Sequence, residues 1–166
     1  MQMRYCYLLV FCVLMVGGAA CAPKISPEVT EKVSWQGEFK TLQADPEAYT
    51  DEFVLLGGKI IRTDNFQGHS EITVLQFPTD YANRPQTDRE SGGRFLVRSD
   101  SFIDPEVYEP GKPVTVAGRV AGAEKRPIGG YEYNHPVIEA EDMWVWEPAK
   151  ERSPRLHFGL GIGTTF

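Results

Sequence analysis

Five short apolar segments, separated by turn-forming residues, dominate the chain between residues 53 and 146. In most of them apolar side chains recur at every second position, the period that puts alternate side chains on opposite faces of a β-strand. We expect strands at residues 53–61, 71–77, 94–98, 113–121 and 137–146. With 16 Gly and 12 Pro in 166 residues, turns should be many and helices few. The chain is therefore predicted to be mainly β.

Two of these segments contain glycine, which is unusual inside strands. Gly57 and Gly58 interrupt the first segment, and Gly118 interrupts the fourth. Glycine weakens a strand unless the strand must bend or approach another backbone closely, and such kinks let one strand serve both sheets of a small barrel. The pattern predicts a small five-stranded Greek-key barrel of the OB type. A β-sandwich is the alternative.

Two short helical turns precede the glycine-containing strands. Residues 45–49 and 104–108 both read Asp-Pro-Glu-x-Tyr. Aspartate is a favoured N-cap, and proline suits the first helical position because its missing N–H has no partner there. We expect Asp45 and Asp104 to cap one turn each.

The N-terminus carries an export signal. Arg4 precedes an apolar run over residues 5–16, and Gly17, Gly18, Ala19 and Ala20 follow. A positive start, a short apolar core and small residues at the end are typical of a secretory signal peptide. The run is too short to span a membrane, which takes about 20 apolar residues.

Cys21 directly follows these small residues. Gly18-Ala19-Ala20-Cys21 resembles the lipobox of bacterial lipoproteins, with Gly18 where Leu is usual. Cys6 and Cys12 would leave with the signal, so Cys21 would have no disulfide partner in the mature chain. We expect Cys21 to be lipidated by two or three acyl chains, because one chain anchors only marginally. An ordinary secretory signal with an incidental thiol is the alternative. Ala22, rather than Asp, after the cysteine resembles the sorting pattern of the outer membrane.

These features divide the chain into four parts. We expect a signal peptide at 1–20, a lipidated cysteine and tether at 21–37, a β-barrel domain at 38–148, and a linker and tail at 149–166. The formal net charge is −6, and loss of Arg4 makes it one unit more negative. Because Lys and Arg supply most of the affinity for phosphate backbones, we expect no nucleic-acid partner.

A series of short motifs follows a distinctive order along the barrel region. They are Gly57-Gly58-Lys59-Ile60, residues 71–75 followed by Tyr81 and Pro85, Gly93-Arg94-Phe95, Asp104-Pro105 with Tyr108, residues 114–118, and Val145-Trp146. Over residues 35–148, together with the Cys21 region, the chain resembles the Slp family of outer-membrane lipoproteins. The resemblance implies a lipid-anchored protein of the outer membrane, and it supplies no catalytic residues.

The residues themselves indicate little chemistry. His69, His135 and His157 lie far apart and lack the spacing of a zinc site, so we expect His69 and His135 to be exposed turn residues. Glu139, Glu141 and Asp142 are expected on a solvated face rather than as paired catalytic acids. We therefore predict no catalytic, metal or cofactor-binding residue, no cofactor and no enzyme activity.

Two further groups of side chains have alternative readings. A set of cations is expected to form an ordinary mixed surface, with anionic headgroup binding as the alternative: Arg84, Arg89, Arg94, Arg98, Arg119, Lys125 and Arg126. A set of aromatic residues is expected to pack in the core or in turns, with a stacking groove as the alternative: Phe66, Tyr81, Phe102, Tyr131 and Tyr133.

The last residues alternate Leu156, Phe158, Leu160 and Ile162 with His157 and glycines. Such a segment could dock on a sheet edge of this domain or of a partner, or remain disordered. We expect a non-catalytic structural or adaptor protein of the envelope, facing the periplasm, with a tail that could contact an envelope protein. A binding module that captures a small or oligomeric ligand on a barrel face is the alternative.

Overall fold

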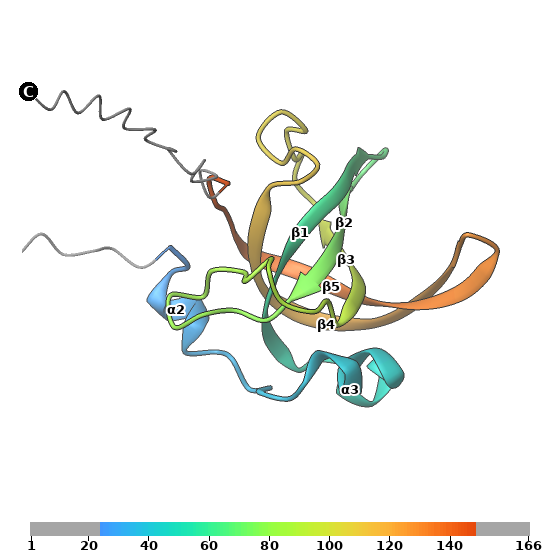
Figure 1. The fold of residues 1–166 in the computed structure, drawn as a ribbon, viewed down its shortest axis with the longest axis horizontal. Coiled ribbons are helices and arrows are strands. Elements are labelled where there is room, and N and C mark those ends of the chain that lie inside the picture. The colour runs from blue at the N-terminus through green and yellow to red at the C-terminus, as the bar shows by residue number, and fades with distance from the viewer. Residues whose placement is uncertain (1–23, 149–166) are drawn as a thin grey trace, which may run out of the picture.

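The alternating segments pair into one closed barrel (Figure 1). The computed structural model describes residues 24–148. Its strands are β1 (Phe53–Asn65), β2 (Ser70–Phe77), β3 (Gly93–Ser99), β4 (Pro113–Ile128) and β5 (Tyr131–Val145). They follow the order β1-β2-β3-β5-β4, and β4 pairs with β1 to close the barrel. The strands β3 and β5 run parallel, and the other neighbours are antiparallel. The predicted mainly β, OB-like barrel is confirmed, and its closure excludes a sandwich.

Gly118 shows why the barrel needs glycine inside a strand. It pairs with Ala140 of β5 where the register shifts between Ala117 and Gly118. A Cβ atom at Gly118 would lie 2.1 Å from the carbonyl oxygen of Glu139. The two backbones therefore approach more closely than any side chain would permit, as the sequence predicted.

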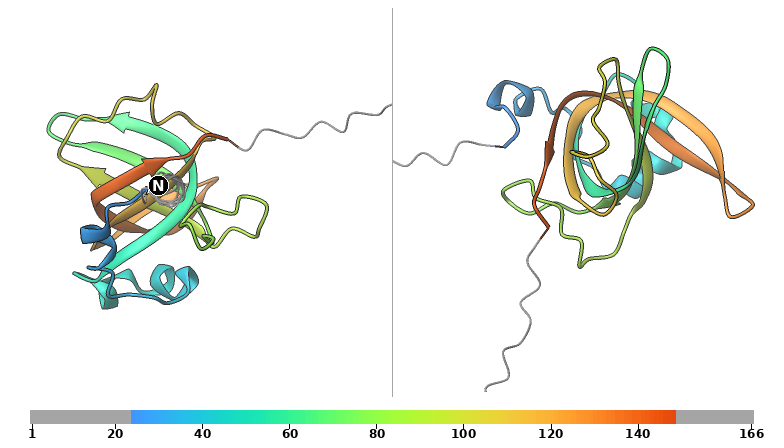
Figure 2. Two further views of the ribbon diagram at one scale, coloured as in Figure 1. Left: turned by 90° about the vertical axis from the view of Figure 1, so that its left-hand side faces the viewer. Right: turned by 90° about the horizontal axis from the view of Figure 1, so that it is seen from above.

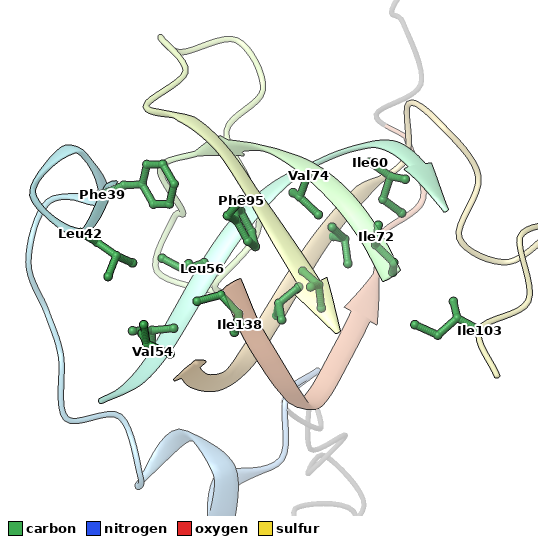
Figure 3. Packing of buried hydrophobic residues seen from close by; sticks show 14 residues of the cluster. Phe39, Leu42, Val54, Leu56, Ile60, Ile72, Val74, Phe95, Ile103 and Ile138 are labelled. Atoms are coloured by element: carbon green, nitrogen blue, oxygen red, sulfur yellow. The ribbon is translucent and has the colours of Figure 1, made fainter. Parts of the chain in front are cut away.

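The barrel interior is filled by apolar side chains (Figure 3). Val54, Ile72 and Phe95 are among the interior residues from different strands that are fully buried. Phe39 and Leu42 pack against this core from α3 (Phe39–Ala44). Ile103, from the loop between β3 and β4, joins the same cluster.

The remaining helical elements are α2 (Pro27–Thr30) and the 3₁₀ turn η1 (Pro46–Tyr49). The expected helical turn at residues 104–108 is present, because the amides of Val107 and Tyr108 donate to the carbonyl of Asp104. The Asp104 carboxylate also accepts from the amide of Glu106 at 2.9 Å. Asp45 makes no side-chain cap, so that part of the expectation was wrong.

Residues 24–37 lie on the barrel, although a tether was expected there. Ile25 and Val29 are buried and pack in one cluster with Phe53 and Ala117. The amide of Ser26 also donates to the carboxylate of Asp142 at 2.9 Å. Two apolar side chains spaced by four residues were too weak a signal to predict this contact. Among residues 24–148, no helix is long and apolar enough to cross a membrane.

The strands β4 and β5 are longer than predicted. Residues 122–128 and 131–136 pair with each other as a two-stranded extension, called here the arm. It projects at the end of the molecule opposite to Lys24 and Pro148 (Figures 1 and 2). Gly129 and Gly130 both have positive φ, as a tight type I′ hairpin turn requires. The arm was not predicted, because its mixed polar and proline-containing sequence lacks the alternation of apolar side chains that indicates a strand.

Candidate functional site

The arm lies across the outer face of β3. Outward-facing Leu96 of β3 pairs with Val137, where β5 leaves the arm and enters the barrel. Both side chains are buried although they point away from the barrel interior. In OB barrels, the face of the second and third strands and the loops beside it are where ligands bind. Here the chain's own β4–β5 hairpin covers part of that face.

One side of the arm is held by a buried carboxylate. Glu71 of β2 is 0% exposed. Its two oxygens accept hydrogen bonds from Arg126 of the arm, at 2.5 and 2.8 Å. This two-pronged pairing is the strongest geometry available to an arginine and a carboxylate. Arg98 of β3 donates to the same carboxylate at 3.3 Å.

Glu124 extends this pair into a network of four charges. Its carboxylate accepts from Nε of Arg126 at 2.6 Å and from Arg98. The hydrogen bond from Arg126 is the main reason that the pKa of Glu124 lies below its ordinary value of 4.5. Hydrogen bonding to Glu71 correspondingly raises the pKa of Arg126. Two arginines and two glutamates balance in charge, so the network stabilises the arm without leaving a net charge beneath it.

The other side of the arm is held by Tyr133. Its hydroxyl accepts a hydrogen bond from the backbone amide of Arg94 at 2.8 Å. Gly93, next to it, has a φ of +134°, and a Cβ there would lie 2.3 Å from the same hydroxyl. The tyrosine therefore occupies space that only a glycine leaves open at the start of β3.

His135 is a buried residue of the arm, and the expectation of an exposed turn histidine was wrong. It is a residue of β5 and only 3% exposed. Its Nδ1 lies 3.1 Å from the carbonyl oxygen of Tyr133, and its ring packs on the Tyr133 ring. Burial lowers the pKa of His135. His69 is half-buried and stacks on Phe66 beside the β1–β2 turn, and His157 lies outside the described residues.

The expected acidic face is only partly solvated. Glu139 and Glu141 are exposed, and Glu141 pairs with Lys32. Asp142 accepts from Ser26 as described above. Within residues 24–148, no group of three or more His, Cys, Asp or Glu side chains is arranged to hold a metal ion. Cys21 lies outside the described residues, so its lipidation stays a prediction.

The cations and aromatic residues separate by location. Arg98 and Arg126 are taken up by the network, whereas Arg84 stacks over Trp146 and Arg119 over Phe53. Four of the aromatic residues are exposed and lie apart from one another, and of these Phe66 packs within its turn on His69 as expected: Phe66, Tyr81, Phe102 and Tyr131. Only Tyr133 belongs to the covered face. Nothing in the sequence indicated the burial of Glu71, which was predicted only as the first residue of a strand.

A cleft of about 670 Å³ lies on a different part of the barrel. Trp35, Phe39 and Leu55 contribute apolar walls, and Gln76 and Asn83 contribute polar groups. It is formed between residues 30–40, β1 and the β2–β3 loop. None of the residues that line this cleft belongs to the arm.

The fold and its covered face define a small closed β-barrel domain whose surface is shaped by its own hairpin arm. The sequence profile of the outer membrane lipoprotein Slp family matches residues 19–160. The chain belongs to this family and is therefore an outer-membrane lipoprotein.

Relatives support the assignment over part of their length. An uncharacterized protein of Haemophilus influenzae is 35% identical over 94 residues, which are 56% of this chain and 51% of that protein. In Escherichia coli, the uncharacterized lipoprotein YeaY is 28% identical over 111 residues, covering 67% of this chain and 57% of its own. The outer membrane protein Slp of E. coli is 26% identical over 111 residues, covering 67% and 58%. The matches thus span a little more than half the length of these relatives.

Among solved structures, a small single-stranded DNA-binding protein from Streptomyces coelicolor matches with a TM-score of 0.40 and 14% identity. The match covers 57% of this chain and 94% of that protein. This match does not indicate a ligand for the present chain.

Proposed function

We propose that the protein is a non-catalytic structural or adaptor component of the cell envelope, held at the outer membrane by lipid on Cys21 and facing the periplasm. The observation that carries this proposal is the arm bound across β3. It places Glu71, Arg98 and Arg126, which would otherwise be the charged groups of a ligand-binding face, in internal pairs. A domain whose charged side chains are paired with one another is suited to present a fixed surface to other proteins.

The arm tip lies at the end of the molecule opposite to the start of the described chain (Figure 1). Tyr131 is exposed beside the Gly129–Gly130 turn, whereas Tyr133 faces the barrel two residues later. These two positions allow a matched cross-linking experiment in intact cells. A photo-reactive phenylalanine analogue at position 131 should give discrete protein adducts, and the same group at 133 should react within the chain.

The adducts at position 131 should disappear when Cys21→Ser removes the anchor. Absence of discrete adducts from position 131, and from positions in the tail, would count against an adaptor role. Adducts that persist unchanged in Cys21→Ser would show that the contact is independent of the membrane, contrary to the proposal.

The cleft supports ligand capture as a second candidate function. Its size lies within the range of small-molecule sites, roughly 300–1,000 Å³, and Trp35 provides a fluorescent reporter in its wall. The dye 1-anilinonaphthalene-8-sulfonate should bind saturably and change Trp35 emission, and Leu55→Arg should abolish that binding. Non-saturable binding, or equal binding by the variant, would discard this candidate.

A further inference from the structure

The described chain starts close to the expected lipid. Lys24 follows Cys21 by three residues, and three residues of extended chain span at most about 11 Å. Whatever surface surrounds Lys24 must therefore lie near the headgroups of the leaflet that holds the acyl chains. The side chains of that surface determine whether it binds the headgroups or only lies near them.

Two tryptophans lie on this surface. The Nζ atom of Lys24 is 4.6 Å from the centre of the Trp144 ring, and Trp144 is 37% exposed. Trp146 follows just after the end of β5, and its indole N–H donates to Thr115, the cross-strand partner of Trp144, so the two tryptophans lie on the same side. The guanidinium of Arg84 is 5.5 Å from the Trp146 ring and donates to the carbonyl of Glu147. Each tryptophan is thus paired with one cation.

A fully exposed tyrosine stands in the adjoining loop. Tyr81 belongs to residues 78–92, which connect β2 to β3 (Figure 1), and Arg84 of this loop contacts Trp146 and Glu147 just after the end of β5. The carboxylate of Asp80 accepts from the amides of Ala82 and Arg84, at 2.8 and 2.9 Å. Tyr81 therefore lies in a turn whose backbone is held by these two hydrogen bonds.

The same loop is fastened to the strands beneath the tryptophans. The hydroxyl of Thr115 donates to the carbonyl of Asn83 at 2.6 Å and accepts from the indole N–H of Trp146 at 2.9 Å. This chain of hydrogen bonds fixes the loop relative to β4 and β5. The aromatic side chains are consequently presented as one surface rather than as independent loop residues.

Two acidic groups near this surface are engaged, whereas Glu147 beside Trp146 is exposed. Asp142 accepts from the backbone of Ser26, and Asp80 accepts within its own turn. Lys24 and Arg84 remain as cations beside aromatic rings. Tryptophan and tyrosine concentrate at membrane–water interfaces because their rings are apolar and their N–H or O–H groups stay hydrated.

We propose that the surface formed by Lys24, Tyr81, Arg84, Trp144 and Trp146 docks on the headgroup layer of the leaflet that anchors Cys21. The proposal rests on the lipid anchor proposed above. It fixes the orientation of the barrel, because the arm projects from the opposite end of the molecule (Figure 1). The anchor then acts as the first of two membrane contacts, and the aromatic surface acts as the second.

The test uses the lipidated full-length mature protein in vesicles of phosphatidylethanolamine and phosphatidylglycerol, with and without bromines on the upper acyl carbons. Bromine quenches tryptophan only at short range. Two of the three tryptophans belong to the docking surface, and the third is Trp35. Emission should therefore fall about twofold in brominated vesicles, as expected for interfacial rings, and this loss should disappear in Trp144→Phe/Trp146→Phe.

A matched control reports on orientation. In the Trp144→Phe/Trp146→Phe background, Tyr131→Trp places a new indole at the arm tip, and its emission should be unaffected by bromine. Vesicle flotation is measured on every sample. Protein that floats without quenching would overturn the docking surface while leaving the anchor intact. Quenching at position 131 equal to that of the wild type would overturn the orientation, and protein that fails to float would overturn both proposals.

Discussion

Arg126 of the arm and Glu71 of β2 meet through two parallel hydrogen bonds, although 55 residues separate them in the chain. The carboxylate has no contact with solvent. Removal of one partner from such a pair leaves a charge that water cannot reach, which generally costs more than the pair itself contributes.

Arg126→Met should therefore lower the free energy of unfolding by about 3 kcal/mol, measured by urea denaturation. Lys32→Met is the matched control, because Lys32 pairs with Glu141 where both side chains are exposed, and it should cost less than about 1 kcal/mol. Equal losses in the two variants would show that the arm is not held by Glu71. The double variant Glu71→Met/Arg126→Met should recover part of the loss.

Burial of His135 predicts a dependence of stability on pH. Its pKa is lowered from the ordinary 6.5, mainly by desolvation, with Arg126 and Arg94 adding to the effect and hydrogen bonds at Tyr133 and Glu124 opposing it. Below pH 6.5 the unfolded chain therefore binds more protons than the folded one, so stability rises with pH. The stability contributed by neutral His135 should be lost as the pH falls through 6.5.

His135→Gln should flatten the dependence of the thermal midpoint on pH between pH 7 and pH 5. Glu124 adds a second loss at lower pH, because its lowered pKa stabilises the folded state above the pKa of the unfolded carboxyl. An unchanged slope in His135→Gln would contradict the assignment of the first transition.

Gly118→Val tests the close approach of β4 and β5. The new side chain would meet the Glu139 carbonyl and the backbone of Ala140, so the strands must separate. We expect a loss of about 1–3 kcal/mol in denaturant unfolding. Lys125→Val, at an exposed position of the same strand, should cost little. Comparable losses would mean that the bulge accommodates a side chain.

Cys21→Ser tests the lipid anchor. Because lipidation needs the thiol, the variant should be released as a mature domain or remain as an uncleaved precursor in the inner membrane. Sucrose-gradient flotation followed by immunoblotting separates these states. Flotation of the variant with outer membranes, as for the wild type, would refute anchoring through Cys21.

The tail can be tested by truncation after Pro148. If residues 149–166 pair with a partner, purified versions spanning 22–148 and 22–166 should melt at nearly the same temperature, and the shorter one should associate less with envelope proteins. A midpoint lower by more than a few degrees in the shorter version would instead indicate that the tail completes the domain's own sheet.

Periodicity was sufficient to predict the barrel because barrel strands direct every second side chain into the apolar interior. Val114, Val116 and Val120 alternate in sequence and are all buried. Gly118 was also predictable, since a glycine in such a strand needs a reason. The arm was not, because its strands pair with each other and lie across β3 rather than lining the apolar interior.

The wrong prediction for His135 and the unpredicted burial of Glu71 have the same physical origin. His135 precedes a proline and was expected in an exposed turn, and the local sequence around Glu71 gave no sign of its arginine partners. Each becomes buried only when the arm folds across β3. The docking surface was equally hidden from the sequence, because Lys24, Arg84 and Trp144 are brought together by the barrel from distant positions.

The arm also affects how copies of this protein can associate with one another. Closing a barrel removes the free edges through which sheets recruit one another, but a two-stranded extension creates two new ones. Each of its outer margins carries a proline, Pro127 on β4 and Pro136 on β5, and Lys125 is exposed between its charged neighbours. Proline has no N–H to donate to an incoming strand, and the charge of a lysine on an edge strand opposes pairing with another edge. Copies crowded on one membrane can therefore display their arms side by side without joining them into a common sheet.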